Sequence, residues 1–344
     1  MILRRSSFKA VLVLLLAGAT GGAMAQQASS LSDERAEIEA RIQALSGELE
    51  SLQLRLEALP EEEDAWHAEI DDPVLEEIAQ RRQLERESTR NPLAITMHRR
   101  NYLFPLSYTT HPNHTAFNDI AADTGPNDLE VKFQFSAKVN LLEDLFGTTG
   151  DLYFAYTQRS WWQAYNTDAS SPFRETNYEP EVFVDFDNRW RMLGWTNTRN
   201  RVAFNHLSNG RSTPLSRSWN RLYLESIFQR GDWAVAVAPH WRIPESDGDD
   251  DNPDIDRYWG YGDITVARRI NGDQEASVMV RGNPSAGNMG TQVDYSWPLF
   301  GNVRGHVQYY YGYAESMIDY DHRNQRLSFG FSVNPLFSGA GGVR

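Results

Sequence analysis

The sequence predicts an all-β protein, a 12-stranded antiparallel transmembrane β-barrel with an N-terminal periplasmic coiled-coil helix. Three observations support this fold class. Residues 1–25 have the pattern of an export signal, segments beyond residue 98 alternate apolar and polar residues, and long connections alternate with tight turns. Alternating segments of about ten residues are typical of strands that cross an outer membrane.

Length and composition exclude other classes of protein. The chain has 344 residues and a formal net charge of −14. It contains no apolar runs near the roughly 20 residues that each membrane-spanning helix of a helical transporter needs. The acidic balance argues against a nucleic-acid partner, because a nucleic-acid groove requires clustered Lys and Arg. The absence of cysteine excludes disulfides, thiolate metal sites and a thiol nucleophile.

Residues 1–25 contain the three parts of a signal peptide. Arg4, Arg5 and Lys9 form a basic start, residues 10–17 form an apolar stretch, and residues 23–25 (Ala-Met-Ala) form a cleavage site. A membrane-anchoring helix is the alternative, and the glycines that interrupt the apolar run disfavour it. We therefore expect the protein to be exported and cleaved after residue 25.

Residues 26–98 are predicted to form a periplasmic segment made of a coiled coil and a charged linker. Apolar residues within 29–60 recur at alternating spacings of four and three, over about four heptads. They are Ile38, Ile42, Leu45, Leu49, Leu52, Leu56 and Leu59. This seam favours a partner helix, in the first place another copy of itself. The alternative is a single amphipathic helix packed on its own protein.

Residues 99–344 are predicted to form the barrel. Segment 129–141 shows the pattern, with apolar residues at odd positions and polar residues at even ones. Such alternation gives a strand one apolar and one polar face. We expect twelve strands, near 99–109, 129–141, 149–162, 178–188, 192–208, 218–229, 231–243, 257–270, 274–283, 289–298, 302–314 and 323–335.

The lengths of the connections separate a membrane barrel from a soluble β-sandwich. The odd-numbered connections have about 5 to 19 residues and the others about 1 to 7, as extracellular loops and periplasmic turns do. A sandwich would need shorter strands with polar outer faces. Since lipid offers no partner to free backbone groups, the sheet should close. We expect a multi-pass barrel in the cell outer membrane, with both termini in the periplasm.

Three polar residues share the apolar face of two neighbouring strands. His206 and Ser208 have the parity of the apolar residues in the strand near 192–208, and Asn220 has the corresponding parity in the strand near 218–229. Ser208 could attack an ester, His206 could take its proton, and the Asn220 amide could orient the imidazole. The alternative is an interfacial hairpin whose polar residues have no catalytic role.

Gln158 lies on the apolar face of its predicted strand as well. Its amide would point into lipid, where an unpaired polar group costs several kcal/mol. This cost favours an interface at which Gln158 pairs with its copy in a second barrel. The alternative is a glutamine high enough on the strand to meet lipid headgroups.

Five motifs resemble those of the outer-membrane phospholipase A family. They occur in the family's order across residues 99–337, nearly the whole predicted barrel. The motifs are Tyr156–Gln163, Ser171–Pro180, Asn205–Ser212, Ser216–Tyr223 and Asp251–Asp254. The resemblance implies a calcium-dependent phospholipase with A1 and A2 activity. It implies that the enzyme acts on phospholipids and lysophospholipids and is activated by dimerisation.

The resemblance also assigns roles to residues. The family's nucleophile, general base and orienting amide match Ser208, His206 and Asn220. The amide of Gly210 matches its oxyanion donor, and Gln158 matches the glutamine of the homodimer interface. Gly210 suits the oxyanion role because its backbone can approach a ligand closely.

The calcium site implied by the resemblance consists of the Arg211 carbonyl and the Ser216 side chain, completed across the dimer by the Ser170 carbonyl. Carbonyl and hydroxyl oxygens are ligands that Ca2+ prefers. Thr213 stands where many relatives have an acidic residue. The acidic loop Asp247–Asp256 could also bind calcium, but we expect it to be an ordinary solvated extracellular loop.

Two other functions remain open at this point. One is a catalytically silent outer-membrane barrel tethered through its coiled coil, and the other is a general porin. Outward-facing His206 and Ser208 argue against a pore, which has no use for polar groups on its lipid face. The sequence does not indicate the acyl-position preference, the headgroup preference or the trigger for activation.

Overall fold

The computed structural model describes residues 36, 38–47, 51, 95–147, 150–246, 248, 250–271 and 274–333. The chain divides into two compact units, 1–71 and 72–344. The predicted signal peptide lies outside the described residues. None of the described helices is both long and apolar enough to cross a membrane.

The described residues of the first unit are helical, as predicted for this part of the chain. The side chains of Ile38, Ile42 and Leu45 are exposed on this helix. The four leucines of the seam that follow lie outside the described residues. The coiled coil and the domain boundaries therefore stay predictions.

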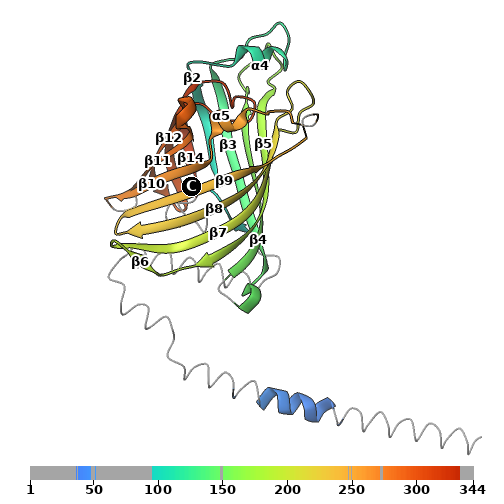
Figure 1. Cartoon of the computed structure of the whole chain (residues 1–344), viewed down its shortest axis with the longest axis vertical. Helices are drawn as coiled ribbons and strands as arrows, with labels where there is room; N and C mark the ends of the chain where they lie inside the picture. The colour runs from blue at the N-terminus through green and yellow to red at the C-terminus, as the bar shows by residue number, and fades with distance from the viewer. Residues whose placement is uncertain are drawn as a thin grey trace, which may run out of the picture. The chain divides into compact units, whose positions relative to one another are not determined.

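The second unit is a closed barrel whose described part contains twelve long antiparallel strands (Figure 1). The strands are β2 (Tyr102–Thr109), β3 (Leu129–Leu142), β4 (Gly150–Trp162), β5 (Phe173–Asp187), β7 (Trp195–Ser208), β8 (Ser218–Arg230), β9 (Trp233–Ile243), β10 (Gly262–Ile270), β11 (Gln274–Asn283), β12 (Asn288–Phe300), β13 (Val303–Gly312) and β14 (Asn324–Ser332). Two-residue strands β1 (Thr96–Met97) and β6 (Arg191–Met192) pair with β3 and β7. The predicted 12-stranded barrel is confirmed.

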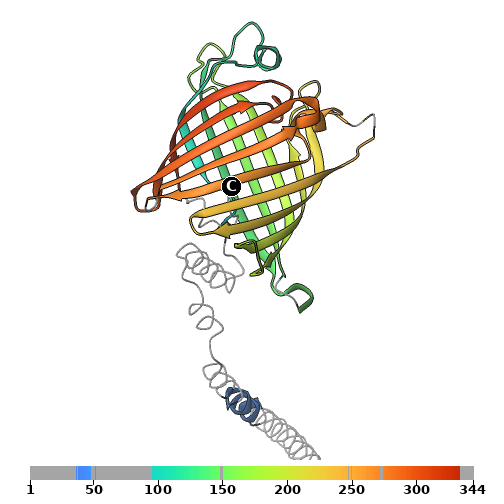
Figure 2. The same ribbon diagram turned by 60° about the vertical axis from the view of Figure 1, so that its left-hand side comes forward.

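Closure of the barrel follows from the pairing of its first and last long strands. β2 pairs with β3 on one side and with β14 on the other, and Tyr102 lies opposite Ser332. The strands run obliquely around the barrel, as Figure 2 shows. Every long strand is therefore flanked on both sides, as backbone groups in lipid require.

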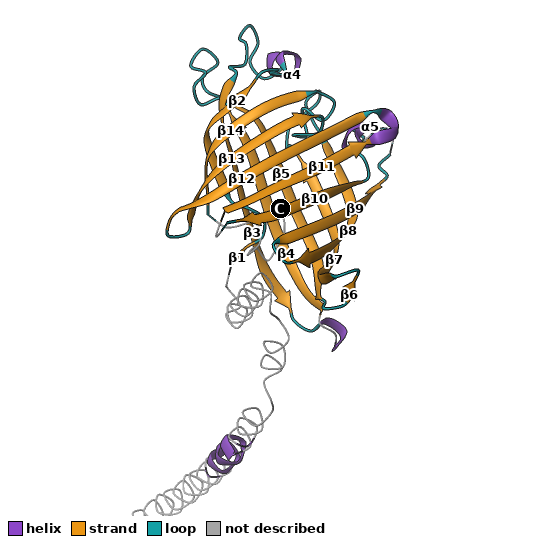
Figure 3. Ribbon diagram, turned by 90° about the vertical axis from the view of Figure 1, so that its left-hand side faces the viewer, coloured by secondary structure: helices purple, strands orange, loops and turns teal. Residues whose placement is uncertain are grey.

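The two ends of the barrel differ (Figure 3). Helices α4 (His114–Asn118) and α5 (Ile255–Trp259) and the longer loops lie at one end. The 3-10 turn η1 (Leu145–Gly147) and the β6 hairpin lie at the other. A further 3-10 turn, η2 (Pro284–Ala286), connects β11 to β12. The end with α4 and α5 is the predicted extracellular end.

Two predicted strand boundaries were wrong. The strand expected near 178–188 begins five residues earlier, at Phe173, where Arg174 and Glu175 turn inward and are buried. The strand expected near 257–270 begins at Gly262. The residues before it form helix α5, which buries the side chains of Ile255 and Trp259. These two residues are four apart and therefore lie on one helical face.

The interior of the barrel is filled with paired charges. Lys132 donates to Glu315 at 2.9 Å, and Arg201 donates to Asp185 at 2.6 Å. The side chains of Lys132 and Arg201 are almost completely buried. Buried charges are tolerated when they are paired and hydrogen-bonded. A packed interior of this kind is unlike the water-filled lumen of a general porin.

Candidate active site

The predicted triad lies on the outer face of the β7–β8 hairpin. In the antiparallel register His206 is opposite Asn220, and Ser208 is opposite Ser218. All four residues are half-buried, whereas Leu207, between His206 and Ser208, is completely buried. The alternation of the strands thus puts the triad residues on the side that faces the membrane, as predicted.

His206 and Asn220 are joined by a hydrogen bond of 2.9 Å between Nδ1 and Oδ1. The amide oxygen can only accept, so the hydrogen is on Nδ1 of the imidazole. In the neutral imidazole, Nε2 then has no hydrogen and can accept one. This is the tautomer that a general base for a serine hydroxyl requires.

Ser208 is placed close to His206 but is not bonded to it. Among the described residues, no hydrogen bond joins Ser208 Oγ to the imidazole. The two residues are two positions apart on one strand face, so a side-chain rotation can bring them together. Catalytic hydrogen bonds are often long or poorly aligned in free enzymes and tighten when substrate binds.

The amide of Asn220 has a second partner, which the sequence analysis missed. Asn220 Nδ2 donates to Glu245 Oε1 at 3.1 Å. Glu245 lies two residues after Ile243, the last residue of β9, which is opposite Asn220 in the β8–β9 register. Only that register brings the start of the β9–β10 loop to the triad. No motif around Glu245 signals the contact.

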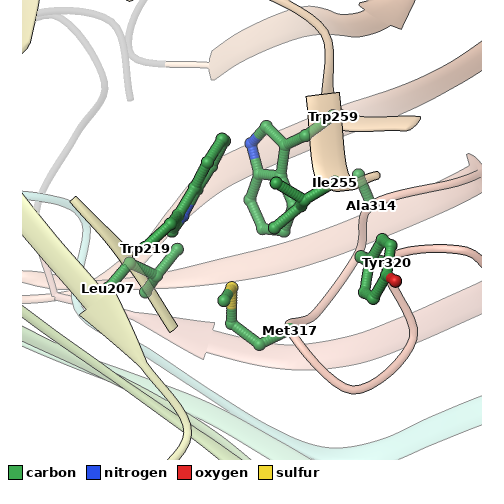
Figure 4. Close-up of a cluster of buried hydrophobic side chains, with 7 residues drawn as sticks. All are labelled: Leu207, Trp219, Ile255, Trp259, Ala314, Met317 and Tyr320. Carbon is green, nitrogen blue, oxygen red and sulfur yellow. The ribbon is translucent and has the colours of Figure 1, made fainter. Parts of the chain in front are cut away.

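A buried apolar cluster supports the hairpin from inside the barrel (Figure 4). It consists of Leu207, Trp219, Ile255, Trp259, Ala314, Met317 and Tyr320. Leu207 and Trp219 are the inward-facing neighbours of the triad residues on β7 and β8. The rings of Trp219 and Trp259 meet edge to face, with their centroids 5.4 Å apart. Packing on one face of the hairpin therefore positions the polar groups on the other.

The loop after Ser208 is held in a tight conformation. Gly210 has a φ of +63°, in the left-handed region that favours glycine. A Cβ at this position would come within 3.0 Å of the Tyr178 ring. Asn209 fixes the loop, since its amide donates to the Leu215 carbonyl at 2.8 Å and accepts from the Arg217 backbone N–H at 3.0 Å. The Gly210 backbone is thus held two residues after the nucleophile candidate, Ser208.

Two oxygen groups suited to calcium, the Ser216 hydroxyl of this loop and the Asp251 carboxylate of the β9–β10 loop, are in contact. Ser216 donates a short hydrogen bond to the carboxylate of Asp251, and the Arg211 carbonyl belongs to the same turn. Carboxylate, hydroxyl and carbonyl oxygens are a donor set that fits Ca2+. Thr213 is not acidic, in contrast to the residue at its position in many relatives. In this chain Asp251 supplies a carboxylate beside Ser216 instead.

The acidic loop is therefore not the ordinary solvated loop that we expected from its sequence. Asp250 accepts a hydrogen bond from Arg242 at 2.6 Å, and the buried Asn252 accepts one from the Ser218 backbone at 2.9 Å. Asp251, between them, bonds Ser216. Hydrogen bonds from the start of β8 and the end of β9 hold this part of the loop in place. Its high charge had led us to expect that water would surround it.

Two predicted residues lie apart from this oxygen cluster. Ser170 is in the β4–β5 loop with a φ of +59°, and no hydrogen bond among the described residues joins it to Arg211 or Ser216. Gln158 lies opposite Tyr178 on β5, which lies opposite Ser208 on β7. Gln158 and Ser208 are therefore in one register row on the outer face, two strands apart.

The fold and the site together define a membrane-spanning β-barrel that carries hydrolase-type residues on its lipid-facing surface. The model of the family phospholipase A1 matches residues 78–333. Phospholipase A1 of Escherichia coli (strain K12) is 39% identical over 247 residues, which are 72% of this chain and 84% of that protein. The chain belongs to the phospholipase A1 family.

Solved structures agree in fold and sequence. The outer membrane phospholipase of Salmonella typhi, a dimer with bound calcium, matches with a TM-score of 0.68 and 39% identity, over 71% of this chain and 94% of that one. An active-site asparagine-to-alanine variant of Escherichia coli outer membrane phospholipase A matches with a TM-score of 0.66 and 38% identity, over 71% and 93%.

Proposed function

We propose that this protein is a calcium-dependent outer-membrane phospholipase that hydrolyses acyl esters of phospholipids and lysophospholipids. The observation that carries the proposal is the 2.9 Å bond between His206 and Asn220 on the outer face, with Ser208 two residues away. The relatives named phospholipase A1, and the calcium-bound dimer among the solved structures, support it. A catalytically silent tethered barrel would need neither the His206–Asn220 hydrogen bond nor a serine beside it.

The chemistry follows from the positions of the side chains. Ser208 Oγ attacks the acyl carbonyl while His206 Nε2 takes its proton, and the Asn220 oxygen holds the Nδ1–H. The backbone N–H of Gly210 donates to the oxyanion. His206 then gives the proton to the leaving alcohol of the lipid. Water, activated by the same imidazole, releases the fatty acid from Ser208.

The metal ion would be held by the Arg211 carbonyl, the Ser216 hydroxyl and the partner subunit's Ser170 carbonyl, with Asp251 adding negative charge. When bound, it supplies positive charge near the developing oxyanion. Asp251 orients the Ser216 hydroxyl in this chain by accepting its hydrogen bond.

Substrate reaches the site from the membrane. The exposed residues around the triad are apolar, including Phe204 and Leu222 on the same outer face. Acyl chains can lie against these side chains without leaving the lipid phase. In a homodimer, a partner barrel docked at Gln158 would cover the same outer face and form the second wall of an acyl-chain cleft.

The proposal is tested by replacing the nucleophile. Ser208→Ala should abolish fatty-acid release from mixed micelles with calcium, whereas Ser218→Ala, the opposite outward serine on β8, should keep it. Heat-modifiable mobility on gels verifies that both barrels are folded. Activity of the unmodified protein should also disappear on calcium chelation. Undiminished hydrolysis by Ser208→Ala would refute the assignment.

A further inference from the structure

We infer that Glu245 is a positioning residue of this active site, which orients the Asn220 amide and through it selects the tautomer of His206. The inference rests on the proposed function and adds a fourth member to the Ser–His–Asn arrangement. It is carried by two hydrogen bonds in series. His206 Nδ1 and Asn220 Oδ1 are 2.9 Å apart, and Asn220 Nδ2 and Glu245 Oε1 are 3.1 Å apart.

The need for such a residue comes from the symmetry of an amide. Asn220 could turn either its oxygen or its nitrogen toward the imidazole, since both ends have similar size and both can hydrogen-bond. With the nitrogen toward His206, the ring would place its hydrogen on Nε2. Nε2 could then not accept the proton of Ser208. An aspartate in this position would not have this ambiguity.

Glu245 removes the ambiguity because an ionised carboxylate can only accept hydrogen bonds. It binds the Nδ2 end of Asn220 and so leaves the oxygen end for His206. Flipping the amide would set an oxygen against the carboxylate and lose a charge-assisted hydrogen bond. The productive tautomer is thus specified by a side chain that does not touch the imidazole.

The charge of Glu245 has a second effect. A neutral amide stabilises imidazolium less than a carboxylate does. Glu245 places a negative charge behind that amide, so it favours the imidazolium that forms when His206 takes the proton. Arg242, a nearby cation on β9, donates instead to Asp250 at 2.6 Å. Among the described residues, no ion pair neutralises Glu245.

The position of Glu245 is built into the fold. Ile243, the last residue of β9, lies opposite Asn220. The chain then leaves the sheet at Pro244. The side chain of the next residue, Glu245, lies against Asn220. Glu245 is half-buried there. Pro244 restricts the backbone at this point, which limits the conformations that the loop can adopt.

The kinetic test uses the full-length protein in mixed micelles with calcium. Glu245→Ala should lower kcat roughly tenfold, since a hydrogen bond to a charged group is worth at least that factor, with KM nearly unchanged. Glu245→Gln should lose less, because its side-chain oxygen can still accept from Nδ2. Asp119→Asn, which removes an exposed charge from another extracellular loop, is the matched control.

A double-mutant cycle separates positioning from general structural damage. Once Asn220→Ala has removed the amide, adding Glu245→Ala should change kcat by less than about twofold. An equal loss in both backgrounds, or an effect on KM alone, would overturn the inference. If Ser208→Ala is inactive but Glu245→Ala matches the unmodified enzyme, this inference fails and the proposed function stands. If Ser208→Ala is fully active, the proposed function itself fails.

The tautomer can also be observed directly. Nitrogen-15 NMR of histidine-labelled protein distinguishes a protonated from an unprotonated ring nitrogen, and the His206→Asn variant assigns the signal. We expect the hydrogen on Nδ1 in the unmodified protein and a shift of population toward Nε2 in Glu245→Ala. An unchanged tautomer in that variant would contradict the positioning role.

Discussion

The outer face of the β7–β8 hairpin combines two demands on its residues that normally conflict. Side chains there must be compatible with lipid, yet hydrolysis needs polar groups. His206, Ser208 and Asn220 meet both demands because each is half-buried and the exposed residues below them on that face, such as Phe204 and Leu222, are apolar. The hydrogen bond between His206 and Asn220 replaces some of the bonds to water that these two groups lose in the membrane.

A substitution of Gly210 tests the proposed role of its backbone N–H as an oxyanion donor. Gly210→Ala should lower kcat roughly tenfold, since it displaces a backbone N–H whose complete loss as an oxyanion donor would cost about 10²–10³. The alanine would be strained at a φ of +63°, and its Cβ would meet Tyr178. Assays of kcat in mixed micelles measure the effect.

Gly301→Ala is the control for backbone strain. Gly301 has a φ of +52° in the β12–β13 turn and open space around it. This variant should carry a similar backbone penalty and keep full activity. Equal activity of the two variants would show that the Gly210 amide is not an oxyanion donor.

At the scale of elements, α5 is the piece that joins the loops to the barrel. Its five residues bury Ile255 and Trp259 against Leu207 and Trp219 of the triad hairpin. A short helix of this kind is not stable alone and depends on its tertiary packing. The hairpin and α5 should therefore stabilise each other.

Truncation of Ile255 tests this coupling. Ile255→Ala should reduce the free energy of unfolding by about 2–4 kcal/mol through a buried cavity. It should also lower activity, although residue 255 does not touch the triad. Denaturant unfolding of the detergent-solubilised barrel measures the first effect. Arg257→Ala, on the exposed side of α5, should change neither quantity, and a loss of the same size in that variant would contradict the packing argument.

For the whole molecule, the arrangement of sites on the surface favours association. Gln158, Tyr178 and Ser208 lie in one row across β4, β5 and β7. A second barrel that pairs at Gln158 would reach the active site of the first. Activity would then depend on concentration in the membrane, which would keep dispersed monomers silent.

The N-terminal segment should shift that equilibrium. A coiled coil of about four heptads would raise the effective concentration of the partner barrel. Deleting residues 29–60 from the mature chain should abolish dimer and activity at low protein concentration and restore both at high concentration. Cross-linking and activity across a dilution series measure this. An unchanged dilution curve would mean that the segment binds some other periplasmic partner.

Much of the barrel could be predicted because its pattern is local. The alternation in residues 129–141 reports the two faces of β3 directly, and the parity of His206 and Asn220 follows from the same period of two. Strand boundaries were harder to predict. Residues 257–259 were assigned to a strand, because the packing that makes them helical depends on Trp219, far away in the sequence.

The sequence by itself determined the closed 12-stranded barrel and the outward face of the triad, since strand period and connection length are properties of short segments. Only the tertiary structure decided that Glu245 meets Asn220 and that Asp251 meets Ser216. Both contacts join the β9–β10 loop to a residue in or just before β8, more than twenty residues earlier in the chain. Their physical cause is the β8–β9 register, which brings the end of one strand beside the start of another.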